Sequence, residues 1–233
     1  MQHTKIEWCD FTINPVKGLC PMHCKTPDGY EYCYAAGERG LYKRFKWNPE
    51  IRFDEKVFWN ICAHKNMKPS KIFIGSTMEL FGDWIPSEWL SNIFAFCRVH
   101  SQHTFIFLTK QPQNLIKGSP FPKNCRVGVT ATNAHMLIEA VHYLKNIEAG
   151  IKFLSIEPLL DWSQHRDLDW LIDLLKTINW VIIGSQTQPI RHPKKEWVDE
   201  IIEAGDKVSI PIFVKEPMAS HYGINRKEFP NDI

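Results

Sequence analysis

The chain has 233 residues, of which 44% are hydrophobic, and a formal net charge of +2 at pH 7. This length fits one large domain with a sizeable core, and so small a net charge does not by itself indicate a polyanion partner. No apolar stretch is long enough to span a bilayer, and the first ten residues, MQHTKIEWCD, lack the apolar region of a secretory signal. We therefore expect a single domain over residues 1–233, located in the cytoplasm.

Seven short apolar segments, rich in β-branched and aromatic residues, recur along the chain. Such nearly continuous apolar runs are typical of strands that are buried on both faces of a parallel sheet. The predicted strands are residues 11–16, 71–76, 103–109, 125–131, 151–158, 180–186 and 209–216. Amphipathic stretches between them predict helices at residues 54–64, 87–100, 133–147, 167–178 and 194–205.

The alternation of strands and helices predicts an α/β fold with a parallel sheet. Seven strands suit a parallel (β/α) barrel, most simply a partial one that is open on one side, and a flat doubly wound sheet is the alternative. In such a barrel, functional residues gather at the C-terminal ends of the strands.

Polar residues do follow the predicted strands. They are Ser76, Thr77, Glu79, Thr109, Lys110, Thr130, Thr132, Asn133, Ser155, Glu157, Ser185, Gln186, Lys215 and Glu216. Helix caps and loop starts account for many such residues in any α/β protein. Glu157 and Lys215 are harder to explain in that way, because burying an unpaired charge is costly.

The chain has seven cysteines, an odd number that argues against a disulfide framework. Three of them, Cys62, Cys97 and Cys125, stand singly in or beside apolar runs, where a free cysteine behaves as a small buried hydrophobe. The other four lie within the first 33 residues, and this clustering indicates a function. They are Cys9, Cys20, Cys24 and Cys33.

The clustered cysteines have the spacing of a ligand set. Three residues separate Cys20 from Cys24, and eight separate Cys24 from Cys33. Thiolates bind zinc and iron–sulfur clusters, so three of them on one loop could hold three irons of a four-iron cluster. One alternative is a zinc site formed by Cys20, His23, Cys24 and Cys33. The other is that the three thiols bind no metal.

A resemblance to a known family covers nearly the whole chain. Its matching pieces are Thr4-Lys-Ile-Glu-Trp8 with Asp10, Asn14-Pro-Val16 before Gly18 and Cys20, Cys33-Tyr-Ala35, Gly75-Ser76 with Leu80-Phe81, Phe107-Leu-Thr-Lys110 with Pro112, Phe153-Leu-Ser-Ile-Glu-Pro-Leu159, and Ile212-Phe-Val-Lys215. With these pieces the chain resembles a family of phage and prophage proteins of unknown function. That family is similar to radical S-adenosylmethionine (radical SAM) proteins and, distantly, to spore photoproduct lyases.

The resemblance implies a radical SAM type of barrel and an enzyme that uses an iron–sulfur cluster to generate a 5′-deoxyadenosyl radical. It implies that Cys20, Cys24 and Cys33 hold a [4Fe-4S] cluster whose fourth iron binds S-adenosyl-L-methionine. The residues implied to line the cofactor pocket are Tyr32, Tyr34, Ser76, Thr77, Thr130, Ser155 and Glu157. The resemblance also implies an external electron donor. A partner protein is a further candidate for an interaction, and the substrate is unknown.

The sequence departs from the family pattern at two places. In family members two residues separate the middle cysteine from the last one, and this chain has Tyr30 at that position, so Cys24 would have to substitute. Gly184-Ser185-Gln186 stands where the family has a Gly-Gly-Glu-like turn, so a carboxylate is absent there.

One segment bears on a nucleic acid or nucleotide substrate. Its basic residues, Lys43, Arg44, Lys46 and Arg52, are interleaved with the aromatics Tyr42, Phe45 and Trp47. Such a set could stack on bases and neutralise phosphates, and a solvated surface loop is the alternative. The competing hypothesis for the whole chain is a zinc-stabilised module that binds nucleic acid or protein without radical chemistry.

Overall fold

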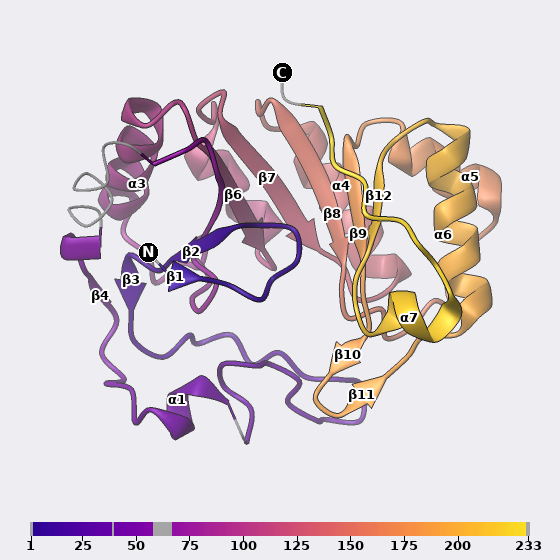
Figure 1. The fold of residues 1–233 in the computed structure, drawn as a ribbon, viewed down its shortest axis with the longest axis horizontal. Coiled ribbons are helices and arrows are strands. Elements are labelled where there is room, and N and C mark those ends of the chain that lie inside the picture. The colour runs from indigo at the N-terminus through magenta and orange to yellow at the C-terminus, as the bar shows by residue number, and fades with distance from the viewer. Residues whose placement is uncertain (1, 39, 58–66, 232–233) are drawn as a thin grey trace. The chain divides into compact units, whose positions relative to one another are not determined.

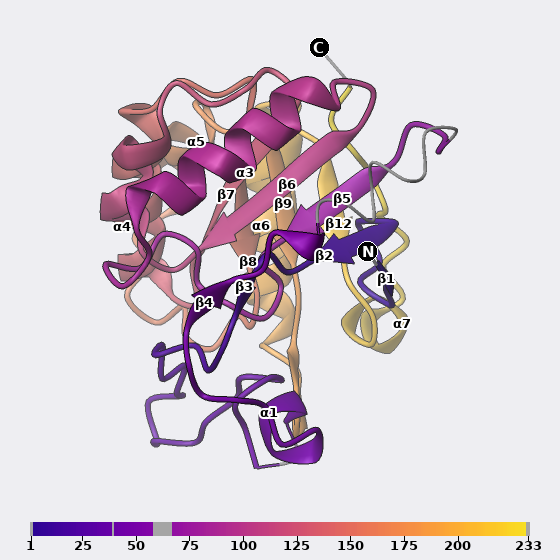
Figure 2. The same ribbon diagram turned by 90° about the vertical axis from the view of Figure 1, so that its left-hand side faces the viewer.

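The computed structural model describes residues 2–38, 40–57 and 67–231. The chain divides into two compact units, Met1–Cys125 and Arg126–Ile233. Each unit contains strands that pair mainly in parallel, together with helices (Figures 1 and 2). The predicted α/β class with a mostly parallel sheet is therefore confirmed. Closure into a barrel and a single domain over residues 1–233 stay predictions.

The first unit has a sheet with the strand order β1-β2-β5-β6. These strands are β1 (Gln2–His3), β2 (Phe11–Ile13), β5 (Lys71–Ile74) and β6 (Thr104–Thr109). Strand β1 pairs antiparallel with β2, and the other pairs are parallel. The unit also contains the small hairpin of β3 (Val16–Lys17) and β4 (Arg52–Phe53), with the helices α1 (Leu41–Arg44), α3 (Ser87–Val99) and the 3₁₀ helix η1 (Pro112–Gly118).

Helix α3 follows β5 and covers part of the first unit's core. It begins after Pro86, whose fixed φ of −60° suits the entry to a first helical turn. Its buried side chains include Phe94, whose ring centroid lies 5.4 Å from that of Phe107 and 5.3 Å from that of Phe121. These edge-to-face contacts hold the helix on β6 through the burial of large aromatic surfaces.

The second unit has four parallel strands in the order β7-β8-β9-β12. They are β7 (Cys125–Thr130), β8 (Ile151–Ile156), β9 (Trp180–Ile183) and β12 (Ile212–Val214). The helices α4 (Ala134–Lys145), α5 (Leu168–Leu175) and α6 (Lys195–Lys207) connect them, and α5 packs against both α4 and α6 (Figure 1). The remaining elements are the hairpin of β10 (Gln186–Thr187) and β11 (Ile190–Arg191), and α7 (Met218–Tyr222).

Two of these helices begin where the sequence places a polar cap. The side chain of Asn133 accepts a hydrogen bond from the backbone N–H of Met136 at 2.9 Å, at the start of α4. The side chain of Asp167 accepts one from Trp170 at 2.8 Å, at the start of α5. Each cap satisfies a backbone donor that has no partner within the helix.

All seven strands predicted from the sequence are present, as are the helices predicted at residues 87–100, 133–147, 167–178 and 194–205. The helix predicted at residues 54–64 falls largely outside the described residues, as does Cys62. Cys97 and Cys125 are fully buried, as expected of small hydrophobic side chains. In the described part of the chain, no helix has both the length and the apolar character needed to cross a bilayer.

The packing of β7 on β8 makes a specific prediction at Gly128. A Cβ at this position would lie 2.3 Å from the Cε2 atom of Phe153, its register partner on β8, and that ring is fully buried. We expect Gly128→Ala to lower the free energy of unfolding by about 1–3 kcal/mol, because overpacking displaces a ring that has no room to move.

Urea denaturation measures this loss. In the double variant Gly128→Ala with Phe153→Leu, the smaller leucine side chain leaves room for the new methyl group. The loss of free energy of unfolding in this variant should therefore be smaller than the sum of the two single losses. Strict additivity would show that the strain does not come from this contact.

Candidate functional site

The loop that leaves β3 carries the three predicted cysteine ligands. Gly18 opens this loop with a φ of +113°, and a Cβ there would lie 2.5 Å from the carbonyl oxygen of Glu50. Only glycine combines that backbone conformation with so close an approach to a neighbouring chain segment. Beyond this turn, Cys20, Cys24 and Cys33 are each half-buried.

The three sulfur atoms influence one another. The Cys24 thiol donates a hydrogen bond to Cys33, and with help from the backbone N–H groups of Ala36 and Ala35 this lowers the pKa of Cys33 to about 6. The same hydrogen bond, together with burial, raises the pKa of Cys24. Burial also raises the pKa of Cys20. The hydrogen bond therefore favours one thiolate shared within the Cys24–Cys33 pair, and the thiolate is the form that binds metals.

Glu79 ties this loop to the ends of two strands. Its backbone N–H donates to the Cys20 sulfur at 3.4 Å. Its buried carboxylate accepts hydrogen bonds from Thr109 Oγ1 at 2.7 Å and from the backbone N–H groups of Phe81 and Lys110 at 3.0 and 2.8 Å. Glu79 and Phe81 follow β5, while Thr109 and Lys110 end β6, so one carboxylate joins both strand ends to the cysteine loop.

Tyrosine hydroxyls make two further connections between the loop and the end of β5. Tyr42 accepts a hydrogen bond from the backbone N–H of Cys20 at 3.2 Å and donates one to the carbonyl oxygen of Thr77 at 2.5 Å. Tyr34 donates to the carbonyl oxygen of Ser76. Tyr32 lies next to Cys24 through a backbone contact, in which its N–H donates a hydrogen bond to the Cys24 carbonyl oxygen at 3.1 Å.

The predicted residues Ser76 and Thr77 lie in the same network. Asn14, which follows β2, donates from Nδ2 to Ser76 Oγ at 3.1 Å and accepts from the Thr77 backbone N–H at 3.1 Å. The Thr77 hydroxyl is buried and has no hydrogen-bond partner within the described residues. A buried hydroxyl without a partner is costly, so it offers a contact to a bound polar group.

The first unit therefore brings together seven of the ten predicted site residues, which are Cys20, Cys24, Cys33, Tyr32, Tyr34, Ser76 and Thr77. The other three, Thr130, Ser155 and Glu157, belong to the second unit.

In the second unit, Thr130 and Ser155 are register partners at the ends of β7 and β8, and each is 1% exposed. The Thr130 hydroxyl has no hydrogen-bond partner within the part of the unit that the structure describes. Glu157 comes two residues after Ser155 and forms an ion pair with Lys215.

This ion pair depends on a glycine between its two strands. Glu157 follows β8 and Lys215 follows β12, and Gly184 directly follows β9, the strand between them. A Cβ at Gly184 would lie 2.8 Å from Glu157 Cγ. Gly184 thus leaves the space in which the two charges meet just beyond the end of β9.

Sequence reasoning missed several residues that hold this site together. Glu79 and Lys110 stood out in the sequence only as polar residues after strands, Asn14 only as part of a family-matching piece, and Tyr42 only as an aromatic of the basic segment and not as a partner of the cysteine loop. The signal that could have found Glu79 is similar to the one that drew attention to Glu157, a carboxylate in the loop that follows a buried strand. Tyr42 gave no such signal, because its contacts with Cys20 and Thr77 join residues that are far apart in the sequence.

The side chains also bear on the zinc alternative. His23, its proposed fourth ligand, has a side chain that is 76% exposed and lies 3.9 Å from Glu31. Across the described residues, no three His, Cys, Asp or Glu side chains are arranged to hold a metal ion, and this applies to the three cysteines as well as to the zinc set.

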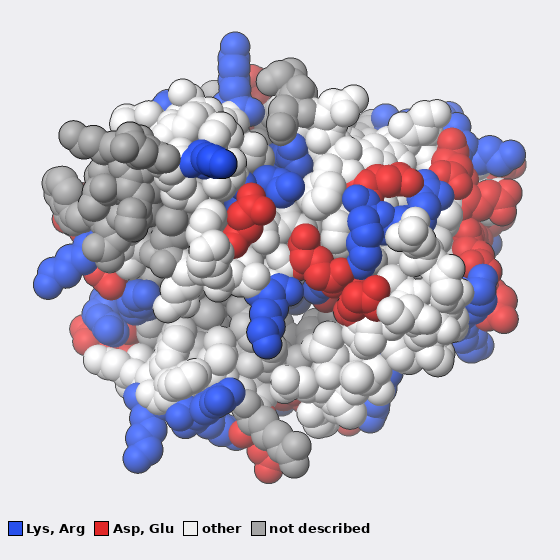
Figure 3. All heavy atoms as spheres, in the orientation of Figure 1, with Lys and Arg blue, Asp and Glu red and all other residues white. Residues whose placement is uncertain are grey.

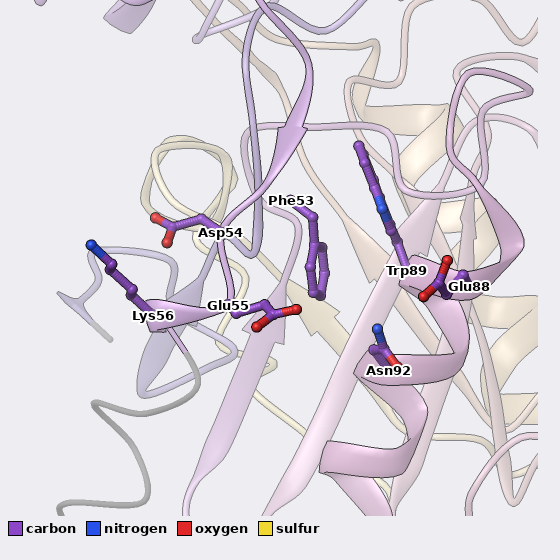
Figure 4. A pocket seen from close by; sticks show the side chains of 7 residues that line it. All are labelled: Phe53, Asp54, Glu55, Lys56, Glu88, Trp89 and Asn92. Carbon is purple, nitrogen blue, oxygen red and sulfur yellow. The ribbon is translucent and has the colours of Figure 1, made fainter.

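A separate hollow of about 500 Å³ occurs in the first unit (Figure 4). Its walls include the rings of Phe53 and Trp89, whose centroids lie 5.6 Å apart. The remaining lining residues are Asp54, Glu55, Lys56, Glu88 and Asn92. None of these belongs to the cysteine loop or to the polar strand ends, so this hollow is not the candidate site.

Residues 3–224 match the family described as "Protein of unknown function (DUF5131)". The chain belongs to this family. The description names no phage origin, so that part of the sequence resemblance stays a prediction. No curated protein matches the DUF5131 chain.

Solved structures of spore photoproduct lyase are similar in fold to the DUF5131 chain. A tyrosine-to-phenylalanine mutant and a complex with dinucleoside spore photoproduct each give a TM-score of 0.59 at 12% identity, covering 91% of this chain and 78% of the other. A double mutant with bound AdoMet and dinucleoside spore photoproduct gives a TM-score of 0.60 at 11% identity, with the same coverage. At this identity the similarity shows the fold.

The Glu79 network makes a prediction about stability. Glu79→Ala would remove the buried acceptor of three hydrogen bonds. Their donors are the N–H groups of Phe81 and Lys110 and the hydroxyl of Thr109. We expect the free energy of unfolding to fall by about 3 kcal/mol. Urea denaturation of the DUF5131 chain measures it, and Glu203→Ala on the exposed side of α6 serves as the control, with an expected change within about 0.5 kcal/mol. Equal losses in the two variants would contradict a structural role for Glu79.

Proposed function

We propose that this protein is a radical S-adenosylmethionine enzyme whose Cys20, Cys24 and Cys33 hold a [4Fe-4S] cluster. The observation that supports this most directly is the gathering of three half-buried thiols on one loop, tied by Glu79 and Tyr42 to the polar ends of parallel strands. The fold similarity to spore photoproduct lyase is consistent with the proposal.

The donor set fits an iron–sulfur cluster better than a single zinc ion. Three thiolates suit soft metal centres, and backbone N–H groups already donate to Cys20 and Cys33, as they do to ligating sulfurs in clusters. The positive charge of Lys110 also favours the thiolate forms of Cys24 and Cys33. A single zinc would need four ligands at about 2.0–2.3 Å from one point, whereas the side chain of His23, the fourth ligand of that alternative, is 76% exposed.

A [4Fe-4S] cluster held by Cys20, Cys24 and Cys33 would, once reduced, supply the electron for reductive cleavage of S-adenosylmethionine. The chain's own residues would bind and orient that cofactor. Tyr32 and Tyr34 offer aromatic surfaces for an adenine ring, and the unpartnered hydroxyl of Thr77, beside Ser76, offers a hydrogen bond to a polar group.

In the second unit, we propose the same role for Thr130, Ser155 and Glu157. The unpartnered Thr130 hydroxyl and the ion-paired carboxylate of Glu157 follow the ends of parallel strands, which is where α/β folds bind ligands. This chemistry needs an electron donor from outside the chain. We also propose a partner protein as a second molecule with which the chain interacts. For the substrate we propose a nucleic acid or nucleotide, because one of the similar structures contains a dinucleoside.

The decisive test of this function is a cleavage assay. The protein, with its cluster reconstituted under anaerobic conditions and reduced with dithionite, should convert S-adenosylmethionine to 5′-deoxyadenosine and methionine, even slowly and without substrate. Chromatography quantifies both products. A protein that carries the cluster and binds S-adenosylmethionine but yields no 5′-deoxyadenosine would contradict the radical function.

The ligand assignment has its own test. Cys20→Ala, Cys24→Ala and Cys33→Ala should each lose the cluster's broad visible absorption and most of its bound iron and sulfide, because each removes one of three thiolate ligands. Cys97→Ala is the matched control, since this fully buried thiol belongs to the core, and it should keep the iron content of the parent. Full iron in Cys24→Ala would show that another residue is the middle ligand, and a colourless parent with one tightly bound zinc would favour the binding module.

A further inference from the structure

A short surface segment of the first unit has features that the proposed chemistry does not use. Five of its residues are called here the basic-aromatic face: Lys43 and Arg44 lie in α1, Phe45 and Lys46 follow α1 directly, and Arg52 lies in β4. All five are exposed, and the ring of Phe45 is 59% exposed. In Figure 3, blue side chains gather on the part of the surface where α1 lies in Figure 1.

The charge of this face is not neutralised by the rest of the unit. Residues 41–52 contain four basic residues and one acidic residue, Glu50, whereas the whole chain has a net charge of only +2. No ion pair joins Lys43, Arg44 or Lys46 to an acidic side chain in the described part of the chain. Arg52 binds the backbone carbonyl oxygen of Glu50 at 3.2 Å, which leaves its charge uncompensated as well.

The aromatic ring at the centre of the face is held out toward solvent. Helix α1 ends after one turn, with the Phe45 N–H donating to Leu41 at 3.0 Å, and Lys46 then takes a φ of +46°. A lysine in this left-handed region is uncommon and points to a constraint other than local preference. The guanidinium of Arg44 lies 5.3 Å from the centroid of the Phe45 ring, a cation–π contact that orients the ring.

The face is also connected rigidly to the cysteine loop. Tyr42, inside α1, packs its ring 5.1 Å from that of Trp47, and its hydroxyl bridges the Cys20 N–H and the Thr77 carbonyl oxygen. A molecule that contacts Phe45 is therefore bound by a segment that is hydrogen-bonded directly to the candidate site.

We infer that the basic-aromatic face binds a single-stranded nucleic acid, with a base stacked on Phe45 and phosphates near Lys43, Lys46 and Arg52. An exposed aromatic ring flanked by cations matches the two contacts that such strands offer, an open base face and a charged backbone. A duplex offers only the phosphates, because its bases are stacked on one another. The four-residue helix α1 is too short for the amphipathic helix with which proteins lie on a lipid surface. This inference deepens the nucleic-acid part of the proposed function, and its evidence does not depend on the cluster.

The test measures fluorescence anisotropy of a labelled mixed-sequence strand of about 12 nucleotides, within the range that one binding surface covers. No S-adenosylmethionine is added, so failure of strand binding is distinguishable from failure of the radical chemistry. We expect the strand to bind more tightly than a duplex of the same length. Phe45→Ala should weaken strand binding roughly tenfold, whereas Phe45→Trp should preserve it, because base stacking is lost only in the first.

The basic residues are tested by salt dependence. Lys43→Gln with Lys46→Gln should reduce the slope of log K against log salt by about 1.4, the value for two phosphate contacts on a single strand. Lys145→Gln with Lys176→Gln in the second unit is the matched control and should leave the slope unchanged. Phe45 is exposed, so circular dichroism of its variants should match that of the parent. Absence of strand binding, equal affinity of Phe45→Ala and parent, duplex binding as tight as strand binding, or binding only to anionic vesicles would each overturn the inference.

Discussion

The candidate site depends on the way the buried Glu79 carboxylate is satisfied. A carboxylate that is withdrawn from water is costly unless donors surround it, and here the donors are the backbone N–H groups of Phe81 and Lys110 and the hydroxyl of Thr109. These groups stand at the ends of β5 and β6, so satisfying one charge fixes two strand ends against each other. Because the Glu79 N–H also donates to the Cys20 sulfur, the same residue fixes the start of the cysteine loop.

Parallel strands explain why so many polar contacts occur at strand ends. All strands of a parallel set end at the same edge, and backbone and side-chain groups there emerge from the apolar core together. Asn14 uses this arrangement to join the ends of β2 and β5 through Ser76 and Thr77. In the second unit, Glu157 and Lys215 meet over the end of β9 in the space that Gly184 leaves free. In each unit, these polar contacts therefore lie at the edge of the sheet where the parallel strands end.

The cysteine loop joins this polar edge to the surface of the first unit. Tyr42 is central to that connection, because its hydroxyl contacts both Cys20 and Thr77 while its helix carries the exposed ring of Phe45. The first unit therefore connects the half-buried thiol of Cys20, the buried Tyr42 and the exposed Phe45 through one set of contacts. Such a combination suits a protein that acts on a charged, aromatic molecule, which is consistent with both proposals made above.

The sequence by itself determined the positions of the seven strands and most of the helices, because continuous apolar runs and amphipathic periods depend only on neighbouring residues. It also identified the three cysteines, since their clustering is a local pattern. The tertiary structure alone decided which polar residues became structural partners of the site. Glu79, Asn14 and Tyr42 act through residues that are remote in sequence, and the ion pair of Glu157 requires a glycine on a third strand. Contacts of this kind are set by the pairing of strands and by the path of a long irregular loop, and no local pattern encodes either.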